Sequence, residues 1–440
     1  MLNPEFKRNL WLQFSLHRLV ATPLLLTLIF LAIRISGMVE ELPRIGRILF
    51  IGIVWLWGTR NATSSIADEL RDKTWDQQRM GALQPWAMTW GKLFGAASFN
   101  WYGGLICLLV VILTELLTTV PSSERTPVLS MIAMGILMHA AAMAASLYIG
   151  IDKTIIQRGG ISWCIVAIGL FARSWLAQLS NDTVIWWHMP YERHSFLLAS
   201  SLSFACVAVF AAWRTMSNAL QVRTLPWAWP LFACLFSLYC AGFYLNAAMS
   251  HFLHIGLIVG MTMTYAALFS ESHTISIWKR IMVRIQARNW RGAFEQLPIS
   301  ITTVALTFTL AVASFFILPS LPYNNIQWMG QALFNHRPEL RFLPFMMALM
   351  LLRDVLVFLF FAFSFNPKRV VTTTLLYLVM INGLLPFLAK AMDFDRLAYF
   401  FVPFYPLYAG SIVIMIAQVL MAGALVFWQW RIQLKVNMSS

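Results

Sequence analysis

The sequence predicts an all-α polytopic membrane protein of about 12 transmembrane helices, each near the 20 apolar residues that cross a bilayer. Of its 440 residues, 59% are hydrophobic and only 11% are charged, whereas a soluble domain has about 25% charged residues. Mean hydropathy is +0.69. The net charge of +14 would suggest nucleic acid for a soluble protein. Here basic residues on the cytoplasmic side of a membrane explain it better, so we expect membrane lipid and no nucleic acid as partners.

Residues 1–18 are predicted to form an N-terminal interfacial helix on the cytoplasmic face. Asn3 and Pro4 suit a helix cap followed by a first-turn proline. Phe6 and Leu10 follow at helical spacing. A frayed polar terminus is the alternative. No cleavable signal peptide is expected, because no short apolar core precedes a small-residue cleavage site.

The apolar runs after residue 18 are interpreted as two six-helix pseudo-repeats. The expected spans are 19–35, 45–64, 93–117, 128–151, 161–179, 196–213, 230–245, 251–270, 299–318, 342–363, 370–388 and 407–427. The expected domains are a first transmembrane unit over 19–213, a cytoplasmic linker over 214–229, a second transmembrane unit over 230–428 and a cytoplasmic tail over 429–440.

The two halves resemble each other in plan. In each, a pair of spans precedes a long loop that opens with a glutamate, Glu69 in the first and Glu271 in the second. Each loop ends near a Leu–Pro element, at 83–85 and at 297–298. Parallel repeats are a common way to build transporters. A coincidence of spacing is the alternative reading.

Orientation follows from the distribution of Lys and Arg. With both termini in the cytoplasm, basic residues favour the inner segments by roughly two to one, as the positive-inside rule expects. This places loops 65–92 and 271–298 in the cytoplasm. We expect a multi-pass protein of the bacterial cytoplasmic (inner) membrane.

The polar stretch 65–92 dominates the first half. It carries Asp68, Glu69, Asp72 and Asp76, although the whole chain has only 18 acidic residues. Charges this dense cannot lie in hydrocarbon. We interpret the stretch as a handle by which another protein moves the membrane domain, and a solvated turn between two membrane helices is the alternative.

Local patterns give the stretch expected structure. Glu69 and Lys73 stand four apart in the order that favours a helix. Pro85 can start the next helix, which would bring Trp86 and Trp90 one turn apart at the membrane interface with Lys92 beside them.

The run 69–79, then Leu83-Gln84-Pro85 and then Gly91-Lys92-Leu93, resembles the cytoplasmic loop of export-type ATP-binding-cassette (ABC) transporter permeases. The resemblance implies a coupling helix that docks on a separate cytoplasmic ABC ATPase, present in two copies, which binds ATP-Mg. The implied coupling residues are Glu69, Arg71, Asp72, Thr74, Trp75, Asp76, Arg79, Leu83, Pro85, Gly91 and Lys92. Two features depart from the family: its permeases usually have six spans and pair as dimers, and the second loop here lacks the Gly-Lys element.

The second loop, 271–298, has its own amphipathic pattern. An apolar stripe at helical spacing includes Trp278, and a basic stripe includes Arg280 and Arg284. With Glu271, these residues form a candidate second coupling loop. A surface helix held by anionic lipid is an equal alternative.

No catalytic machinery is indicated in this chain. The motifs G-x-x-x-x-G-K-[ST], H-E-x-x-H and G-x-S-x-G are absent, and the five cysteines include no C-x-x-C pair. We therefore expect no enzyme activity, catalytic residue, cofactor or metal site in the chain itself. Arg173, Arg353 and Asp354 fall within spans and are candidate pathway charges, because charges inside a membrane are costly. A purely structural pairing of either arginine is the alternative.

The function expected from these observations is the permease subunit of an ATP-driven ABC exporter. The alternative is an ion-coupled secondary transporter of about 12 spans, which would need an intramembrane carboxylate. Asp354 is the only good candidate for that carboxylate. The transported substrate is not readable from the sequence.

Overall fold

The structure is a computed structural model. It describes residues 3–72, 74–81, 83–117, 127–149, 183–222, 225–243, 248–271, 273–317, 343–364, 370–392, 394, 400–401 and 409–439. The chain divides into two compact units. Unit 1 comprises Met1–Val184 and Pro190–Thr224, and unit 2 comprises Ile185–Met189 and Leu225–Ser440. The main division, after Thr224, falls within the expected linker 214–229.

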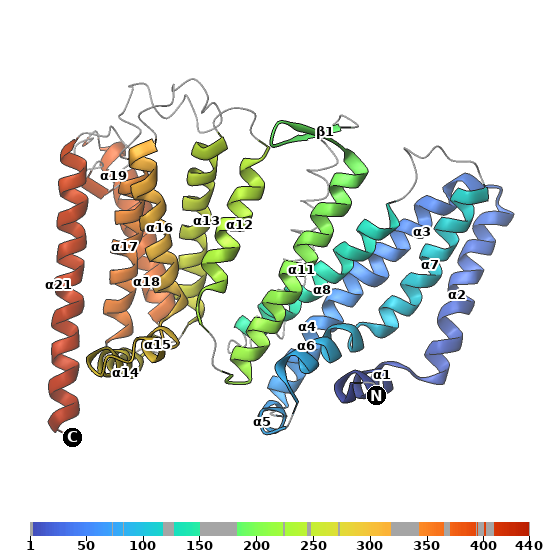
Figure 1. The fold of residues 1–440 in the computed structure, drawn as a ribbon, viewed down its shortest axis with the longest axis horizontal. Helices are drawn as coiled ribbons and strands as arrows, with labels where there is room; N and C mark the ends of the chain where they lie inside the picture. The colour runs from blue at the N-terminus through green and yellow to red at the C-terminus, as the bar shows by residue number, and fades with distance from the viewer. Residues whose placement is uncertain are drawn as a thin grey trace. The chain divides into compact units, whose positions relative to one another are not determined.

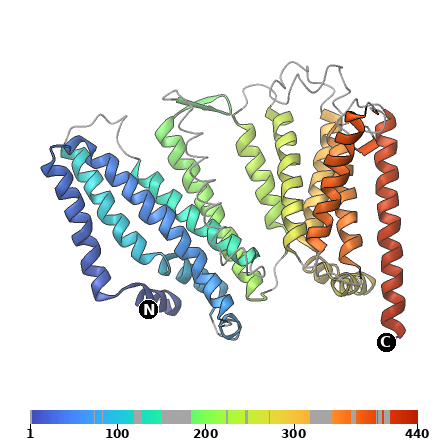
Figure 2. The ribbon, with the colours of Figure 1, turned by 180° about the vertical axis from the view of Figure 1, so that it is seen from behind.

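Unit 1 is a set of long helices with shorter ones at one end (Figure 1). In chain order these are α1 Pro4–Gln13, α2 Leu16–Ile35, the 3-10 helix η1 Val39–Glu41, α3 Leu42–Phe50, the π-helix η2 Ile51–Gly58, α4 Thr59–Arg71, α5 Trp75–Arg79, α6 Pro85–Gly95, α7 Ser98–Leu117, α8 Val128–Ile149 and α11 Arg193–Ala219. Helix α8 packs between α4 and α11, and α3 packs on α7. Helix α1 lies crosswise to α2 and against α6, as Figures 1 and 2 both show.

Unit 2 is built in the same style. Its helices are α12 Ala228–Ala241, α13 Ala248–Ser270, α14 Ile275–Gln286, α15 Trp290–Phe294, α16 Ile299–Ile317, α17 Leu343–Ala362, α18 Val370–Val379, the π-helix η8 Met380–Leu384, α19 Leu385–Ala391 and α21 Ala409–Ser439. Helix α13 packs against α12 and α16, and α17 packs against α16 and α21.

The predicted class, a helical multi-pass membrane protein, is confirmed. Among the described residues, ten helical segments are long and apolar enough to cross a membrane. They are Leu16–Ile35, Val39–Glu69, Ser98–Leu117, Val128–Tyr148, Arg193–Ala219, His251–Phe269, Ile299–Ile317, Leu343–Ala362, Val370–Ala389 and Ile412–Gln433. Of the two other expected spans, 230–245 corresponds to α12, which has only 14 residues. The span 161–179 lies outside the described residues.

Several boundaries differ from expectation, because no helix breaker stands where the sequence was divided. Segment Val39–Glu69 is continuous over 31 residues, which is about 47 Å at 1.5 Å per residue. Since the hydrocarbon core is about 30 Å thick, this helix continues well past the expected end at residue 64. Likewise, α11 runs six residues into the expected linker, and α21 contains most of the expected tail 429–440.

One short sheet interrupts the all-α pattern. Strands β1 Thr183–Trp186 and β2 Met189–Glu192 pair as a hairpin. Trp187 and His188 both have positive φ, 50° and 65°, as a two-residue type I′ turn requires. The indole of Trp186 donates to the carbonyl of Tyr239 on α12 at 3.0 Å. The aromatic residues Trp186 and Trp187 therefore lie in and beside the turn of this hairpin.

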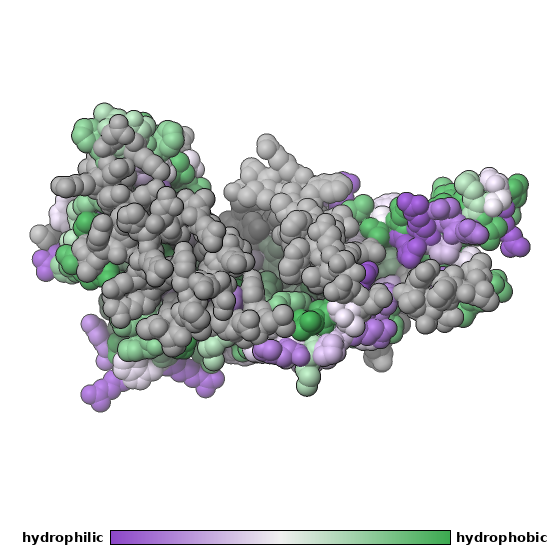
Figure 3. All heavy atoms as spheres, turned by 90° about the horizontal axis from the view of Figure 1, so that it is seen from above, coloured by the Kyte–Doolittle hydropathy of each residue, from purple (hydrophilic) through white to green (hydrophobic). Residues whose placement is uncertain are grey.

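Apolar side chains cover much of the described surface, and hydrophobic residues are visible on the face drawn in Figure 3. Two segments are extreme: the apolar window of Leu16–Ile35 is 11% buried and that of Val370–Ala389 is 6% buried. Apolar surface of this extent does not face water in a soluble monomer. Lipid or a partner helix must cover these segments.

Candidate functional site

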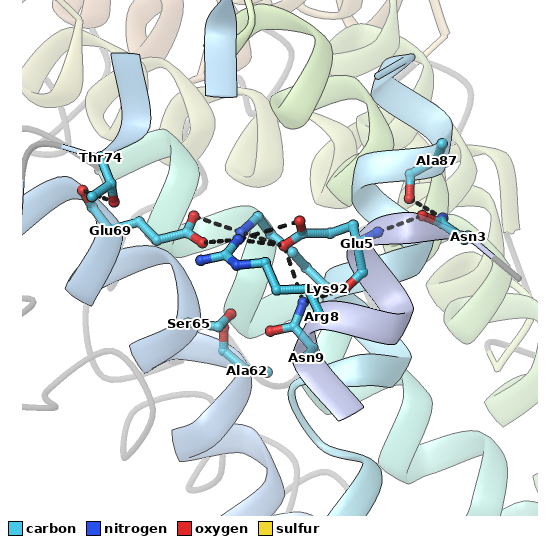
Figure 4. Close-up of polar contacts among 10 residues, drawn as sticks. All are labelled: Asn3, Glu5, Arg8, Asn9, Ala62, Ser65, Glu69, Thr74, Ala87 and Lys92. Carbon is cyan, nitrogen blue, oxygen red and sulfur yellow. Dashed lines mark hydrogen bonds and ion pairs between the residues drawn. The ribbon is translucent and has the colours of Figure 1, made fainter. Parts of the chain in front are cut away.

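A cluster of charged side chains joins three helices at one end of unit 1 (Figure 4). Glu5, Arg8 and Asn9 come from α1, Glu69 from the last turns of α4, and Lys92 from α6. Lys92 is fully buried, at 0% exposure. A buried ammonium group is tolerated only when it is paired, so the contacts of Lys92 determine how this end of the unit is built.

The cluster alternates positive and negative charge. Lys92 Nζ lies 2.5 Å from Glu69 Oε2 and 3.1 Å from Glu5 Oε1. Arg8 Nη1 lies 3.0 Å from Glu69 Oε1 and 3.1 Å from Glu5 Oε1. Asn9 Nδ2 donates to Glu5 Oε1 at 3.0 Å. Two carboxylates and two cations therefore neutralise each other at the point where α1, α4 and α6 meet.

The pKa values agree with a charged cluster. Burial alone would raise the pKa of Glu5, but Lys92, Arg8 and Asn9 outweigh burial and bring that pKa below its ordinary value. Burial opposes the charge of Arg8 in the same way, and Glu5 and Glu69 raise the pKa of Arg8 in spite of it. Because the pKa of Glu5 is depressed, its stabilising effect is present above about pH 4.5 and is lost as the pH falls further.

Helix α1 is held in place by its cap as well as by charge. The side chain of Asn3 accepts from the backbone N–H of Glu5 at 3.0 Å, and Pro4 occupies the first turn. The same Asn3 donates through Nδ2 to the carbonyl of Ala87 on α6 at 2.5 Å. A helix therefore forms at the expected N-terminal position, and its cap bonds directly to the first turn of α6.

Two glycines let α1 approach α6 closely. A Cβ atom on Gly91 would lie 2.7 Å from Glu5 Cβ and 2.9 Å from the backbone nitrogen of Phe6. A Cβ on Gly95 would lie 2.6 Å from Asn9 Cβ. Such distances leave no room for a side chain. Gly91, singled out in the sequence as part of a Gly-Lys element, is thus the contact surface for the N-terminal helix.

We expect Gly91→Ala to displace α1 from α6 and to cost about 1–3 kcal/mol of unfolding free energy, as overpacking does. Thermal unfolding in detergent and protease cleavage within 3–15 would report the displacement. Gly52→Ala is the matched control, since a Cβ there meets nothing within 4 Å. Equal behaviour of the two variants would contradict the close packing.

The middle of the stretch is short helix α5, whose two sides differ. Trp75 is buried among Ile66, Met88 and other apolar residues of α4, α6, α8 and α11. Asp76 is exposed, and Met80, directly after the helix, is 81% exposed. Arg79 Nε donates to the carbonyl of Ala219 on α11 at 2.9 Å. The tip of the stretch is thus anchored by one indole and offers its opposite side to solvent.

Other expected residues of the stretch are distributed around this anchor. Thr74 donates through Oγ1 to the carbonyl of Glu69 at 3.3 Å, Leu83 packs beside Trp75, and Pro85 begins α6. Asp72 caps the end of α4 through its backbone N–H. Arg71 belongs to α4, but its side chain lies outside what the structure describes.

One local expectation needs revision, and another falls on a residue outside the described part of the chain. Trp86 and Trp90 are half exposed, and their rings stack with their centroids 6.2 Å apart, as expected. Lys92, however, does not lie beside them and is buried on another side of α6. Glu69 binds Lys92 and Arg8, whereas its expected partner Lys73 lies outside the described residues. The ion pairs of Glu69 that the structure describes are therefore both long-range.

The second loop has a different construction. Its opening residue, Glu271, accepts from the backbone N–H groups of Ile299 and Ser300 at 2.9 and 3.3 Å, and so caps the first turn of α16. Burial raises the pKa of Glu271 against these hydrogen bonds. Trp278 packs inward against Phe363. Arg280 is exposed, and Arg284 Nη1 donates to the carbonyl of Gly292 at 2.5 Å.

The buried side chain of His273, in the same loop, predicts that the stability of the protein depends on pH. It is 6% exposed, it packs on the ring of Phe358, and neither ring nitrogen has a hydrogen-bond partner among the described residues. Burial lowers the pKa of His273 from 6.5 to about 4. The unfolded chain therefore takes up the proton first, and stability falls as the pH drops from 6.5 to 4.

We expect unfolding free energy to decrease by up to about 3 kcal/mol across that window, at 1.36 kcal/mol per pKa unit. His273→Phe should reduce this dependence in a pH series of denaturation curves by the part that His273 contributes. An identical pH dependence in His273→Phe would refute the assignment.

A second polar network lies inside the membrane-crossing helices of unit 2. Arg353 Nε and Nη2 donate to Asp354 Oδ1 at 2.9 and 2.7 Å, and Nη1 donates to Gln418 Oε1 at 2.9 Å. Nη2 also bonds to Asn382, in the π-helix η8. Tyr265 donates to Asp354 Oδ2 at 2.7 Å. The network joins α13, α17, η8 and α21.

Arg353 and Asp354 are 4% and 0% exposed, and Tyr265, Asn382 and Gln418 each form at least one hydrogen bond to them. In this conformation the network ties four helices together and offers no open charge to a substrate. Arg173, the other candidate pathway charge, lies outside the described residues. No group of three or more His, Cys, Asp or Glu among the described residues could hold a metal ion.

Sequence reasoning missed Glu5, Arg8 and Asn9 as partners of the polar stretch, and Tyr265, Asn382 and Gln418 as partners of Arg353. The one available signal was the pair of small residues Gly91 and Gly95, four apart on α6, a spacing that favours close helix contact in membranes.

The fold and these two networks define a helical multi-pass membrane protein, with one charged cluster at a helix end and one within the membrane-crossing helices. Comparisons with protein-family models, with curated proteins and with solved structures give no match to this chain. The resemblance of stretch 65–92 to an ABC permease loop rests on its own residues.

Proposed function

We propose that this chain is the membrane subunit of an ATP-driven ABC exporter and that α5 is its coupling helix. A separate cytoplasmic ATPase, in two copies, binds ATP-Mg and docks on the exposed side of α5. The chain itself carries no phosphate-binding loop of the G-x-x-x-x-G-K-[ST] type. In this proposal the two units act as six-helix pseudo-repeats in a bacterial inner membrane, with both termini in the cytoplasm.

The observation that carries the proposal is the construction of the polar stretch. An exposed tip, at Asp76 and Met80, lies between the membrane-crossing segment Val39–Glu69 and α6, which leads into the membrane-crossing helix α7. Trp75 is anchored in the apolar core of unit 1. The Lys92–Glu69 ion pair ties the end of the long helix Val39–Glu69 to α6. A displacement of the tip is therefore transmitted to the membrane helices instead of being absorbed by a loose loop.

The buried cluster changes which residues should test coupling. The resemblance makes Glu69 a coupling residue, but Glu69 holds Lys92 and Arg8, so a reversal of its charge would disturb the helix ends themselves. Glu69 and Lys92 are positioning residues in this proposal. Asp76 and Met80 are the residues that a partner can contact.

The test is co-purification from the native host with an affinity tag on this chain. We expect a soluble ATPase with a phosphate-loop motif to co-purify, together with ATP hydrolysis. Asp76→Lys with Met80→Glu should lose both while the protein still inserts. The control is Met38→Glu, at an exposed position near the opposite end of α2. Association that survives the tip substitutions would contradict coupling through α5.

The alternative function, an ion-coupled secondary transporter, can be tested at the buried carboxylate of Asp354. Asp354 is buried and bonded to Arg353, Tyr265 and Asn382. A secondary transporter that used this carboxylate would lose ion-driven uptake in Asp354→Asn vesicles and would work without ATP. The ABC proposal instead expects transport to require ATP and to survive collapse of the proton gradient.

A further inference from the structure

The segment between α13 and α16, here called the basic hairpin, comprises α14 Ile275–Gln286 and α15 Trp290–Phe294. It lies across the end of unit 2 at the point where α13 ends and α16 begins (Figures 1 and 2). Both flanking helices are long and apolar enough to cross a membrane. Only a few residues separate them from the hairpin, so it must lie near the membrane surface.

The hairpin divides its apolar side chains between two directions. Ile281 is buried, and Trp278 packs on Phe363 in the core of unit 2. Several other large apolar side chains are exposed, among them Met282 at 53%, Val283 at 63%, Trp290 at 57% and Phe294 at 54%. Packing within unit 2 therefore uses only part of the apolar surface, and the rest needs an apolar neighbour outside the unit.

The charge of the hairpin is almost wholly positive. Its basic residues are Lys279, Arg280, Arg284, Arg288 and Arg291, and the first acidic residue after Glu271 is Glu295. Glu295 forms an ion pair with Arg291 at 3.5 Å, but the Arg291 side chain remains 85% exposed. Basic residues beside exposed Trp and Phe are the composition of helices that lie in an anionic membrane surface.

The conformation of the hairpin is fixed by its own contacts. Arg288 has a φ of 54°, in the left-handed region, at the turn between the helices. Asn289 Oδ1 then accepts from the N–H of Gly292 at 3.0 Å and caps α15. Arg284 bonds across the turn to the carbonyl of Gly292. The apolar and basic groups are therefore presented as one preformed surface.

We infer that the basic hairpin is a binding surface for anionic phospholipid: Arg280, Arg288 and Arg291 bind the headgroups, and Val283, Trp290 and Phe294 enter the apolar boundary beneath them. Charge complementarity selects this occupant over a second ATPase contact. At the exposed tip of the first loop, Asp76 is paired with Arg79 at 3.2 Å, whereas the hairpin presents an excess of cations together with aromatic rings. The inference is independent of the exporter proposal.

The test places a spin label at Val283→Cys and, as a matched control, at Met80→Cys, in full-length protein whose native cysteines are alanine. The protein is reconstituted in nanodiscs of phosphatidylcholine alone or with phosphatidylglycerol. With phosphatidylglycerol, the label at 283 should be relaxed several-fold more by oxygen than by a water-soluble nickel complex, and the label at 80 should show the reverse. Removing phosphatidylglycerol should shift the label at 283 toward the nickel complex.

A triple variant should abolish the effect of phosphatidylglycerol on the relaxation of the label at 283; it carries Arg280→Gln, Arg288→Gln and Arg291→Gln. The corresponding triple lysine variant should retain that effect. The lysine variant keeps the test decisive if the glutamine variant does not fold. A label at 283 as exposed to nickel as the label at 80 would overturn the inference. So would unchanged readings with and without phosphatidylglycerol, or protection that arises only when a cytoplasmic ATPase is added.

Discussion

Replacing Lys92 with methionine is expected to lower the unfolding free energy of the protein by about 3–5 kcal/mol, the usual cost of breaking a buried ion pair from one side. Lys92 is fully buried between Glu5 and Glu69, at 3.1 and 2.5 Å. Without it, two nearly buried carboxylates share Arg8, whose side chain is 46% exposed. Denaturation of the purified protein in mild detergent measures the loss.

Two further variants test whether the loss of stability comes from the uncompensated buried charge. The double variant Lys92→Met with Glu69→Gln removes one of the two carboxylate charges together with the cation. It should recover a substantial part of the unfolding free energy that Lys92→Met alone loses. Arg44→Met breaks an exposed pair with Glu41 at 3.5 Å and should cost no more than about 1 kcal/mol. A Lys92→Met protein as stable as the Arg44→Met protein would show that the cluster does not hold the three helices.

The second large effect is expected at Arg353. Arg353→Met leaves Asp354 buried with the hydroxyl of Tyr265 and the amide of Asn382 but without its cation. We expect a loss of about 3–5 kcal/mol, measured by the same denaturation assay. Because η8 is held to α17 through Asn382, the helix Val370–Ala389, which is only 6% buried, should also become accessible to protease.

The double replacement Arg353→Met with Asp354→Leu is the control for this second prediction. Well-packed apolar residues in place of a buried ion pair are often neutral in stability, so this variant should be closer to the unchanged protein than Arg353→Met is. A double variant that is less stable than the single one would mean that the network contributes specific structure beyond compensation of charge.

The membrane class was predictable because its signal is local. A run such as 299–317 is apolar over the length of a bilayer, and no tertiary contact is needed to recognise it. Caps are equally local: Asn3 and Pro4 predicted the start of α1, and the structure has that start. Where the sequence offered no Gly or Pro, as after residue 424 in α21, the expected boundary was too early.

The charged networks were not predictable for the opposite reason. Glu5 and Lys92 are far apart in sequence, and the approach of α1 to α6 is decided by three-dimensional packing at Gly91 and Gly95. The two partners that Glu69 has among the described residues, Arg8 and Lys92, are 61 and 23 positions away in the sequence, beyond the reach of a helix-spacing rule. Glu271 was read as the counterpart of Glu69, yet it caps a helix through backbone hydrogen bonds.

The most direct measurement of the central claim is photo-crosslinking from the tip of the polar stretch. A benzophenone amino acid replaces Met80 in one sample and Met38 in the control, in living cells of the native host. The exporter proposal predicts that position 80, but not position 38, becomes covalently joined to a soluble ATPase with a phosphate-loop motif, and that ATP changes the yield. Crosslinks from position 80 only to lipid or to extracytoplasmic proteins would contradict it.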